Sequence, residues 1–534
     1  SHRSSGTRSA RTPDSLPTKI SKHKTHTSTH SETISKDGVR HIQRGYGYVI
    51  AVDRPRAEED FMTTAEPAPT MTIDGKQVAG EATFDVVDPA TGEAFAQAPA
   101  ATVAQVDAAM EAAQRAQVPW AQDETARQKA MNAAADQLDE HADELATTLV
   151  REQGRPFANA VREIKLAVLW LRHFAGLELQ REILVDSETE WVEKIRHPLG
   201  VVAAITPWNA PILLATWKLA PALRTGNTVV LKPSPYTPLT TLAMAELFAR
   251  VLPAGVFNVV TGPDPLGASL TEHTIPRKVS MTGSTATGRR VAAAAGADLK
   301  RVTLELGGND PAIVLGDVTP SAIADKLFDS ALINSGQICF AVKRVYAHAD
   351  VYDAVVGELA RRASDARLGD GFDPQTTHGP LSNKTQLDKV AHYVDDAVAR
   401  GATAVTGGYV LARPGYFYAP TVLRDAVDGM PVVDEEQFGP VIPVIRFDDV
   451  DVVVDRINAQ EFGLTASVWS ADVDAAAAVA ARIDAGQVSV NAHGSGFRPS
   501  LPFSGHKHSG IGVENGIEVL SEYTSTTVLV RPQH

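Results

Sequence analysis

Short apolar strands alternate with helix-length segments from residue 200 onward, and this alternation constrains the fold more than any other feature. Two of the intervening segments, 239–251 and 285–295, are long enough for helices. The predicted strands are 200–206, 228–231, 256–260, 278–281 and 302–305. Nearly continuous apolar strands separated by helices are typical of a parallel sheet covered on both faces. The sequence therefore predicts an α/β fold.

Helices are predicted before residue 200, and a second strand–helix series is predicted after residue 305. Residues 103–180 carry apolar side chains at helical spacing and few glycines, which predicts several long amphipathic helices. A second strand–helix series has strands at 312–314 and 344–347, a helix to about 335 and another over 350–364. This series predicts a second α/β domain.

Two further β segments are predicted near the ends of the chain. Residues 71–76 have the pattern of a strand that leads into a turn. Residues 520–531 form a β segment with no hairpin partner nearby in the sequence. A strand of this kind often pairs across subunits, so we expect it to take part in oligomerisation.

Composition and charge narrow the function classes. The chain has 534 residues, is 44% hydrophobic and carries a net charge of −14. It holds no apolar run long enough for a transmembrane helix, and its acidity disfavours nucleic-acid binding. Residues 1–61 are basic and rich in Ser and Thr, without apolar periodicity. We expect them to be a disordered or non-native arm, and a targeting peptide is the alternative.

Cys339 is the only cysteine of the chain. It has no partner for an internal disulfide or a cysteine zinc site, and we predict no metal site. A single unpaired thiol fits a reducing, cytoplasmic compartment. By itself Cys339 is either a buried small hydrophobe or a nucleophile.

Other residue types that carry chemistry lie near the ends of predicted strands. In 206–211, Asn209 is either a turn residue or a donor to an oxyanion. Gly283 and Ser284 lie between a strand and a helix, where backbone N–H groups suit a pyrophosphate, although an ordinary helix cap has the same pattern. Glu305 ends a strand as either a general base or an exposed acid.

Eight motifs, taken together and in this order, resemble the aldehyde dehydrogenase superfamily from about Met71 to Leu529. The motifs are Pro207-Trp208-Asn209, Trp217-Lys218, Lys232-Pro233-Ser234, Thr282-Gly283-Ser284, Leu304-Glu305-Leu306-Gly307-Gly308, Gly336-Gln337-Ile338-Cys339, Glu436-Gln437-Phe438-Gly439-Pro440 and Pro502-Phe503-Ser504-Gly505. The resemblance implies a non-acylating enzyme that oxidises an aldehyde to a carboxylic acid with NAD(P)⁺.

The resemblance implies catalytic roles for five residues. Cys339 is the nucleophile that forms a thiohemiacetal and then a thioester. Asn209, with the backbone N–H of Cys339, holds the oxyanion. Glu305 activates the water that hydrolyses the thioester, and Lys218 and Glu514 support proton relay around that base.

The resemblance also implies binding roles. Lys232 matches the lysine that holds the adenine ribose, Gly283 and Ser284 match the pyrophosphate turn, and Glu436 and Phe438 match contacts to the nicotinamide ribose and ring. The other implied cofactor-binding residues are Thr206, Pro207, Trp208, Ser234 and Leu306. The implied aromatic walls of the aldehyde tunnel are Trp217, Phe340 and Phe503.

The domain organisation follows from the same resemblance. It implies a Rossmann-like cofactor domain over 71–180 and 198–307 and a catalytic domain over 308–508. Residues 181–197 and 520–534 are implied oligomerisation segments. We therefore expect a homodimer or a homotetramer, with a small-molecule aldehyde as the partner and no nucleic acid or membrane.

One departure from the family pattern affects the cofactor. Pro235 stands where many NAD-preferring members carry a glutamate that binds the adenine ribose and repels a 2′-phosphate. We therefore expect NAD as the cofactor, with NADP use possible. The tunnel aromatics favour an apolar or aromatic aldehyde. His493, Ser495 and Arg498 match the substrate-facing loop, so a polar substituent is also open.

Three alternative functions are considered, the first within the same family and the other two outside it. A CoA-acylating dehydrogenase typically lacks the general base, so Glu305 argues against it. A thiol esterase could use Cys339 and Asn209 without a cofactor, but the matched cofactor residues make this a side activity. A catalytically silent protein would be expected to have lost Cys339 or Glu305, and both are present.

Overall fold

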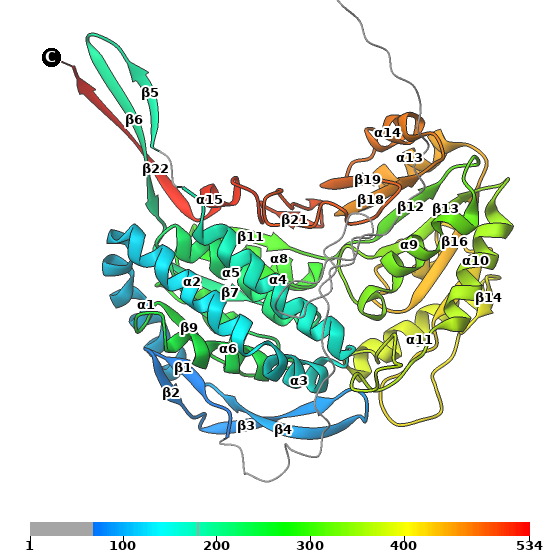
Figure 1. Cartoon of the computed structure of the whole chain (residues 1–534), viewed down its shortest axis with the longest axis horizontal. Coiled ribbons are helices and arrows are strands. Elements are labelled where there is room, and N and C mark those ends of the chain that lie inside the picture. The colour runs from blue at the N-terminus through cyan, green and yellow to red at the C-terminus, as the bar shows by residue number, and fades with distance from the viewer. Residues whose placement is uncertain (1–67, 179–180, 534) are drawn as a thin grey trace, which may run out of the picture. The chain divides into compact units, whose positions relative to one another are not determined.

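The computed structural model describes residues 68–178 and 181–533 and shows the predicted α/β fold (Figure 1). The first large sheet has the strand order β2-β1-β9-β8-β7-β10-β11-β21. Its strands are β1 (Met71–Ile73), β2 (Lys76–Val78), β7 (Val201–Ile205), β8 (Thr228–Lys232), β9 (Phe257–Val259), β10 (Lys278–Thr282), β11 (Arg301–Glu305) and β21 (Gly510–Ile511). The predicted strands from 200 to 305 are thus confirmed.

The first sheet is parallel only in its centre. Strands β7 to β11 pair in parallel, whereas β1 pairs antiparallel with β9 and with β2, and β21 pairs antiparallel with β11. The predicted parallel sheet is therefore confirmed for the strands between 200 and 305, and antiparallel strands extend it at both edges. The edge strands lie far from the βαβ series in sequence, so no crossover helix constrains their direction.

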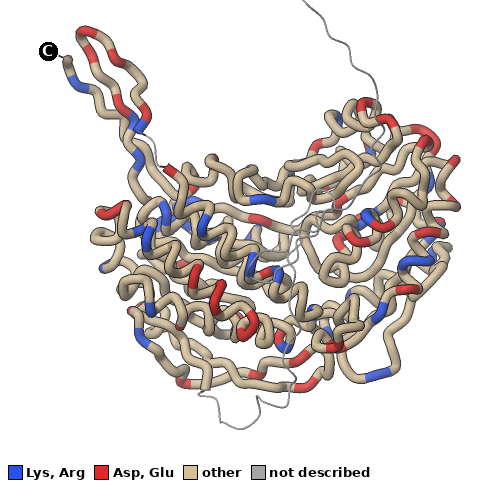
Figure 2. The backbone as a smooth tube through the Cα atoms, in the orientation of Figure 1, with Lys and Arg blue, Asp and Glu red and all other residues tan. Residues whose placement is uncertain are grey.

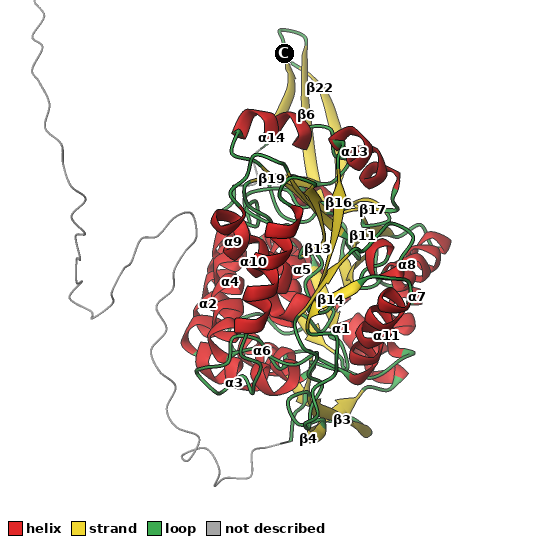
Figure 3. Cartoon of the chain, turned by 90° about the vertical axis from the view of Figure 1, so that its right-hand side faces the viewer, coloured by secondary structure: helices red, strands yellow, loops and turns green. Residues whose placement is uncertain are grey.

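Helices cover both faces of this sheet, as predicted. Figure 3 shows α2 and α4 on one side of the strands and α7 and α8 on the other. The helices of this region are α1 (Val103–Gln122), α2 (Glu124–Glu140), α3 (Ala142–Gln153), α4 (Phe157–Ala175), α5 (Pro211–Arg224), α6 (Leu239–Ala249), α7 (Leu266–Glu272) and α8 (Thr285–Ala297). Thr102 begins α1 with a capping box, in which its side chain and that of Gln105 each accept from the other residue's backbone N–H.

The second large sheet has the order β14-β15-β16-β13-β12-β18-β19, and it confirms the predicted second strand–helix series. Its strands are β12 (Asp310–Val314), β13 (Val342–His348), β14 (Thr403–Thr406), β15 (Thr421–Arg424), β16 (Val441–Phe447), β18 (Thr465–Trp469) and β19 (Gln487–Val490). Its helices are α9 (Pro320–Leu332), α10 (Tyr352–Asp365), α11 (Lys384–Ala399), α12 (Pro431–Asp434), α13 (Val450–Ala459) and α14 (Val473–Ala480). All its pairs are parallel except β14 with β15.

The second sheet separates two apolar cores. Along β12, Ile313 packs into one core, whereas Ala312 and Val314 pack into the other. This alternation follows from the two-residue period of a strand. Because both faces of the sheet are buried, its strands form a rigid support for the loops at their ends.

A three-stranded antiparallel ribbon extends from the first sheet region (Figure 1). It contains β5 (Glu182–Asp186), β6 (Glu190–Pro198) and β22 (Thr524–Pro532). The C-terminal strand has no hairpin partner nearby in the sequence, as predicted, and β22 pairs with the distant β6 of the same chain from Thr524↔Pro198 to Pro532↔Glu190. Its part in oligomerisation stays a prediction. The start of the predicted β segment is instead the short helix α15 (Val519–Glu522).

Smaller elements complete the described part of the chain. Strands β3 (Ala82–Asp88) and β4 (Glu93–Ala100) form a hairpin, and β17 (Phe462–Gly463) pairs with β20 (His506–Lys507). In the ranges 68–178 and 181–533, no helix is both long and apolar enough to cross a membrane. The arm predicted for residues 1–61 lies outside the described residues, and the predicted domain boundaries stay predictions.

Candidate active site

The loop between α9 and β13 carries Cys339. Helix α9 ends at Leu332, and a single 3₁₀ turn follows over Ile333–Gly336, close to the predicted helix end at about 335. Asn334 and Ser335 have φ angles of 51° and 56°, which L-residues rarely adopt. A side chain at Gly336 would collide with the backbone carbonyl of Gly439. These constraints leave the loop little freedom to adopt another backbone conformation. In this conformation Cys339 is 9% exposed.

Buried polar side chains hold this loop from within. The amide of Gln337 donates to the Asn334 carbonyl at 3.0 Å and accepts from the Ser382 backbone at 2.9 Å. Lys343 Nζ donates to the carbonyls of Gly336 at 3.1 Å and Ile338 at 2.5 Å. These bonds fix the peptide units that lead up to Cys339.

Asn209 reaches the same loop from the end of β7. Its side-chain Nδ2 donates to the carbonyl of Gln337 at 3.0 Å, two residues before Cys339. Its own carbonyl accepts from Asn334 Nδ2 at 3.1 Å and from the Arg155 guanidinium. Asn209 is buried, so its amide is held in a dry site next to the thiol.

A buried ion pair lies behind Asn209. Arg155 is paired with Glu163, and both side chains are buried. Glu163 Oε1 also accepts from the backbone N–H groups of Ile212 at 2.9 Å and Leu213 at 3.2 Å, in the first turn of α5. Sequence analysis missed this pair, because neither residue lies near a recognised motif and buried pairing leaves no periodic signal.

Glu305 ends β11 with its carboxyl beside the Cys339 thiol. The side chain is 2% exposed, so the alternative of an exposed strand-end acid is wrong. Neither carboxyl oxygen has a hydrogen-bond partner within the described part of the chain. Burial raises the pKa of Glu305 to about 8, against the lowering effects of Cys339 and Lys218. Burial and the Glu305 charge also raise the pKa of Cys339 well above its usual value.

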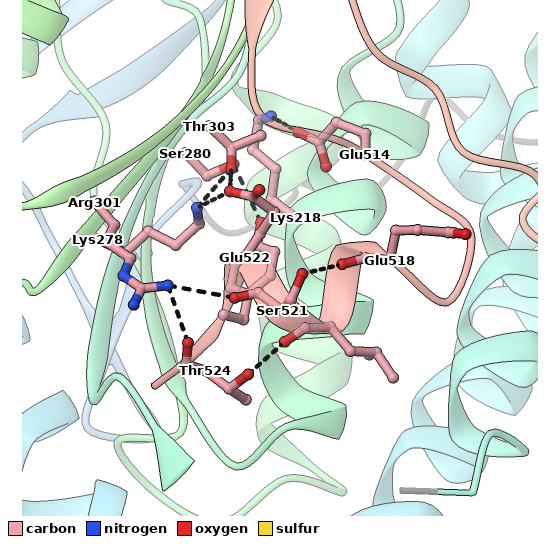
Figure 4. A network of polar contacts seen from close by, with 12 residues as sticks. Lys218, Lys278, Ser280, Arg301, Thr303, Glu514, Glu518, Ser521, Glu522 and Thr524 are labelled. Carbon is pink, nitrogen blue, oxygen red and sulfur yellow. Dashed lines mark hydrogen bonds and ion pairs between the residues drawn. The ribbon is translucent and has the colours of Figure 1, made fainter. Parts of the chain in front are cut away.

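Lys218 and Glu514 form a buried ion pair in the same region. Lys218 Nζ donates to Glu514 Oε1 at 2.9 Å, with side-chain exposures of 0% and 2% (Figure 4). A backbone bridge between Phe503 and Glu514, with bonds of 2.7 and 2.8 Å, holds the glutamate there. Figure 4 also shows Lys278 facing Thr303 and Glu522 next to this pair.

Most of the predicted cofactor-binding residues lie at the carboxyl ends of the parallel strands in the first sheet. The parallel register pairs Ile205 with Lys232 and Thr282 with Glu305, so the strand ends lie side by side. Lys232 is buried, its Nζ donates to the Pro233 carbonyl at 3.2 Å, and burial lowers its pKa to about 8. The other predicted residues at these strand ends are Thr206, Pro207, Trp208, Ser234, Gly283 and Leu306.

The turn from β10 into α8 has the geometry of an anion site. Ser284 is the N-cap of α8, and its hydroxyl accepts from the Thr287 backbone at 3.2 Å. A Cβ at Gly283 would lie 2.5 Å from Met281 Cε, so a larger residue there would displace the end of the Met281 side chain. The remaining N–H groups at the start of a helix suit a phosphate.

Glu436 and Phe438 lie between α12 and β16, and they contact residues that follow the strands of the first sheet. Glu436 Oε1 accepts from the Gly308 backbone at 3.1 Å. The Phe438 ring packs edge-to-face on Trp208, with centroids 5.4 Å apart. Residues predicted from separate motifs thus meet across the two sheets.

Aromatic rings gather beside Cys339 and extend the predicted tunnel wall. Phe340 lies 6.2 Å from Phe503, which lies 5.3 Å from Trp217 between ring centroids. Two rings that sequence analysis missed complete the group. Phe497 lies 4.8 Å from Phe340, and Trp170 stacks on Trp217 at 5.9 Å. Trp170 lies on the apolar face of α4, where nothing in the spacing distinguishes a tunnel residue from a core residue.

The polar residues considered for substrate contact have other partners. His493 is buried, and its ring nitrogens bond the Ser467 hydroxyl at 2.9 Å and the Phe340 carbonyl at 2.8 Å. The Ser495 hydroxyl donates to Ser489 Oγ at 3.0 Å. His493 therefore supports the loop after the thiol, and its ring is turned away from the surface.

Comparison with known proteins agrees with this geometry. The model of the aldehyde dehydrogenase family matches residues 77–529. The aldehyde dehydrogenase LUC3 of a Fusarium species is 39% identical over 459 residues, covering 85% of this chain and 96% of the relative. An NAD⁺ complex of aldehyde dehydrogenase from Bacillus cereus superposes with a TM-score of 0.85 at 36% identity, covering 88% of this chain and 97% of that one.

Two further solved structures extend the comparison. An NADP-dependent enzyme of E. coli has a TM-score of 0.84 at 35% identity, covering 87% of this chain and 98% of that one. Betaine aldehyde dehydrogenase from Staphylococcus aureus, in complex with NAD⁺, has a TM-score of 0.84 at 32% identity, covering 88% and 95%. The chain belongs to the aldehyde dehydrogenase family, and it is an NAD(P)-dependent oxidoreductase.

Proposed function

We propose that this chain oxidises an aldehyde to a carboxylic acid through a thiohemiacetal and then a thioester on Cys339. One observation carries the proposal. Asn209 from the end of β7, Glu305 from the end of β11 and Cys339 from the loop before β13 meet in one buried site. A thiol, a carboxyl and an amide donor are the groups that nucleophilic capture and hydrolysis require.

In the capture step, the Cys339 thiol releases its proton to solvent water, and the thiolate sulfur attacks the carbonyl carbon of the aldehyde. The carbonyl oxygen becomes negative, and Asn209 Nδ2 and the Cys339 backbone N–H donate to it. One N–H of Asn209 is already bonded to the Gln337 carbonyl, which leaves the second for the oxyanion. Because the donors are fixed and buried, they need little reorganisation during the reaction.

NAD⁺ or NADP⁺, when bound, accepts the hydride from the captured substrate. The turn at Gly283, which has no side chain of its own, and the cap at Ser284 fit its pyrophosphate. Lys232 would bind the adenine ribose, and Glu436 would bind the second ribose. Trp208 and Phe438 supply apolar walls for the ring that reacts.

In the hydrolysis step, Glu305 takes a proton from water while the water attacks the thioester carbon. Only the ionised carboxylate can do this, so its raised pKa makes the step depend on pH. Lys218 favours the ionised form of Glu305. The acid product then leaves, and Cys339 is free for the next turnover.

Rapid mixing of enzyme, aldehyde and NAD⁺ tests the mechanism. We expect Glu305→Gln to give a burst of one reduced cofactor per chain, followed by a steady state slowed by about 10²–10⁴-fold. The wild-type kcat should rise with pH toward the Glu305 pKa of about 8, and the variant should lack this rise.

Cys339→Ser is the matched control, because it should show neither a burst nor turnover. A Glu305→Gln steady state equal to that of the wild type would contradict the assignment of the base. A burst in Cys339→Ser would contradict the assignment of the nucleophile.

The aromatic group supports an apolar or aromatic aldehyde as the substrate. Phe340 and Phe497 are partly buried, and they pack on the buried rings of Trp217, Phe503 and Trp170 in the apolar cluster that also contains Cys339. A panel of benzaldehyde, hexanal and betaine aldehyde, assayed with both NAD⁺ and NADP⁺, would test this preference. A higher kcat/KM for betaine aldehyde than for the uncharged aldehydes would contradict it.

The three-stranded ribbon supports a homodimer or homotetramer. Nearly all of β5 and β22 is exposed, including Leu184, Val528 and Val530 at 47%, 54% and 57%. Figure 2 shows acidic and basic residues along the same ribbon. A ribbon with so little buried surface needs packing against another surface to be stable. The single cysteine supports a reducing, cytoplasmic location.

A further inference from the structure

Lys343 lies directly under the nucleophile loop. It follows Cys339 by four residues, stands in β13 and is 1% exposed. Its Nζ donates to the carbonyls of Gly336 and Ile338, both in the segment that directly precedes Cys339. It also lies 5.3 Å from the centre of the Phe438 ring. A buried ammonium group therefore faces the segment that presents the sulfur.

This ammonium lacks a contact ion pair. No carboxylate oxygen lies within 4.0 Å of Lys343 Nζ among residues 68–178 and 181–533. Other buried lysines differ, because Lys218 has Glu514 at 2.9 Å and Lys278 has Glu522 at 3.6 Å. The titratable groups that face Lys343 at longer range are Glu436, Asp310, Lys389 and Cys339.

A buried charge without a contact partner is unfavourable. Burial accordingly lowers the pKa of Lys343, whereas the carboxyls and the Cys339 thiolate raise it. Burial raises the pKa of Cys339, and Glu305, Glu436 and Asp310 raise it further. The thiolate is thus surrounded by negative groups, and a neighbouring cation would offset part of that repulsion.

We propose that Lys343 is the cationic partner of the Cys339 thiolate and a positioning residue of the nucleophile loop. Ionisation of the thiol gives the buried ammonium a counter-charge, and the ammonium in turn stabilises the reactive form of the nucleophile. The bond to the Ile338 carbonyl holds the ammonium against the peptide unit that directly precedes Cys339. This inference rests on the proposed role of Cys339 as the nucleophile.

Alkylation by iodoacetamide tests the proposal without turnover, because Cys339 is the only cysteine and the thiolate is the form that reacts. We would measure the alkylation rate against pH without cofactor in the wild type, Lys343→Gln, Lys343→Met and Lys343→Arg. Glutamine keeps a donor without the charge, methionine removes both, and arginine keeps the charge.

We expect Lys343→Gln and Lys343→Met to raise the pH midpoint of alkylation by about one unit or more, the usual effect of losing a nearby opposite charge. At a pH below both midpoints, the rate should then fall about tenfold. Lys343→Arg should keep the wild-type midpoint.

The matched control is Lys300→Gln, which neutralises another buried lysine, one that donates to the Thr271 carbonyl at 2.8 Å. Its alkylation midpoint should stay at the wild-type value. Circular dichroism melting identifies variants that fail to fold, and Lys343→Gln together with Lys343→Arg suffices if Lys343→Met does not fold.

An unchanged midpoint in folded Lys343→Gln would overturn the proposal. The proposal would also fail if only Lys343→Met reduced the alkylation rate, and did so equally at every pH. That result would mean that Lys343 positions the loop without stabilising the thiolate. The assay is independent of the reaction. If Cys339→Ser kept dehydrogenase activity, the proposed function would fail while the alkylation midpoints were still measured.

Discussion

At the scale of single residues, we propose that Pro235 affects how the adenine ribose is held. It is partly exposed in the loop that follows β8, three residues after Lys232. Proline offers no side-chain acceptor for the ribose hydroxyls and no negative charge against a 2′-phosphate. The similar structures include both an NAD⁺ complex and an NADP-dependent enzyme. Family membership is therefore compatible with either cofactor, and we propose that the charge at position 235 contributes to the preference.

Pro235→Glu should shift the preference toward NAD⁺. A carboxylate there would accept two charge-assisted hydrogen bonds from the ribose and repel the phosphate of NADP⁺. We expect a change in the ratio of kcat/KM values worth on the order of 1–3 kcal/mol. Pro235→Gln is the control, because it adds an acceptor without the charge. No NADP⁺ turnover in the wild type, or an unchanged ratio in Pro235→Glu, would contradict this role.

At the scale of elements, the N-terminus of α5 shows how a remote pair positions a loop. Glu163 on α4 accepts from the first turn of α5, and Arg155 in the connection before α4 holds the carbonyl of Asn209. The helix end and the loop before it are thus tied to one buried ion pair. Removal of either charge leaves the other buried and unpaired.

Arg155→Met should destabilise the protein by about 3–5 kcal/mol, because Glu163 would keep its charge without a partner. It should also lower kcat, because the Asn209 loop would be less firmly held. Chemical denaturation and steady-state kinetics measure the two effects. The double variant Arg155→Met/Glu163→Gln should recover part of the stability. A double variant less stable than Arg155→Met alone would show that the ion pair is not the cause.

At the scale of the whole molecule, the three-stranded ribbon is the part of the described chain with the least internal support. Strand β22 is paired along its full length with β6, yet most of its side chains are exposed. Val528 and Val530 lie on one face, and Thr527 and Leu529 lie on the other, because side chains alternate along a strand. Each face is a candidate surface for a second copy.

Aspartate substitutions on one face at a time should identify the oligomer surface. We compare Val528→Asp/Val530→Asp with Thr527→Asp/Leu529→Asp by light scattering coupled to size exclusion. The pair on the interface should reduce the mass toward the 56.9 kDa of one chain, while the other pair leaves it unchanged. A wild-type mass of one chain, or no change with either pair, would contradict the proposed oligomer surface.

Local chemistry was readable from the sequence because it depends on neighbouring residues. The apolar runs set the strands and helices of both sheets, since burial of such segments requires period-two or helical packing. The glycine turn before α8 and the strand end at Glu305 were likewise visible, because caps and strand termini are local features. The motifs around Asn209, Glu305 and Cys339 also identified the family.

Only the tertiary structure decided what surrounds those residues. The pairing of β22 with β6 joins segments more than 300 residues apart, and no local signal specifies such a partner. The full burial of Glu305, the Arg155–Glu163 pair and the unpaired charge of Lys343 arise where several elements converge. Burial and long-range Coulomb interactions set the pKa values of these groups, and both depend on the packed fold. The sequence thus determined which groups could react, and the packing determined their charge and their partners.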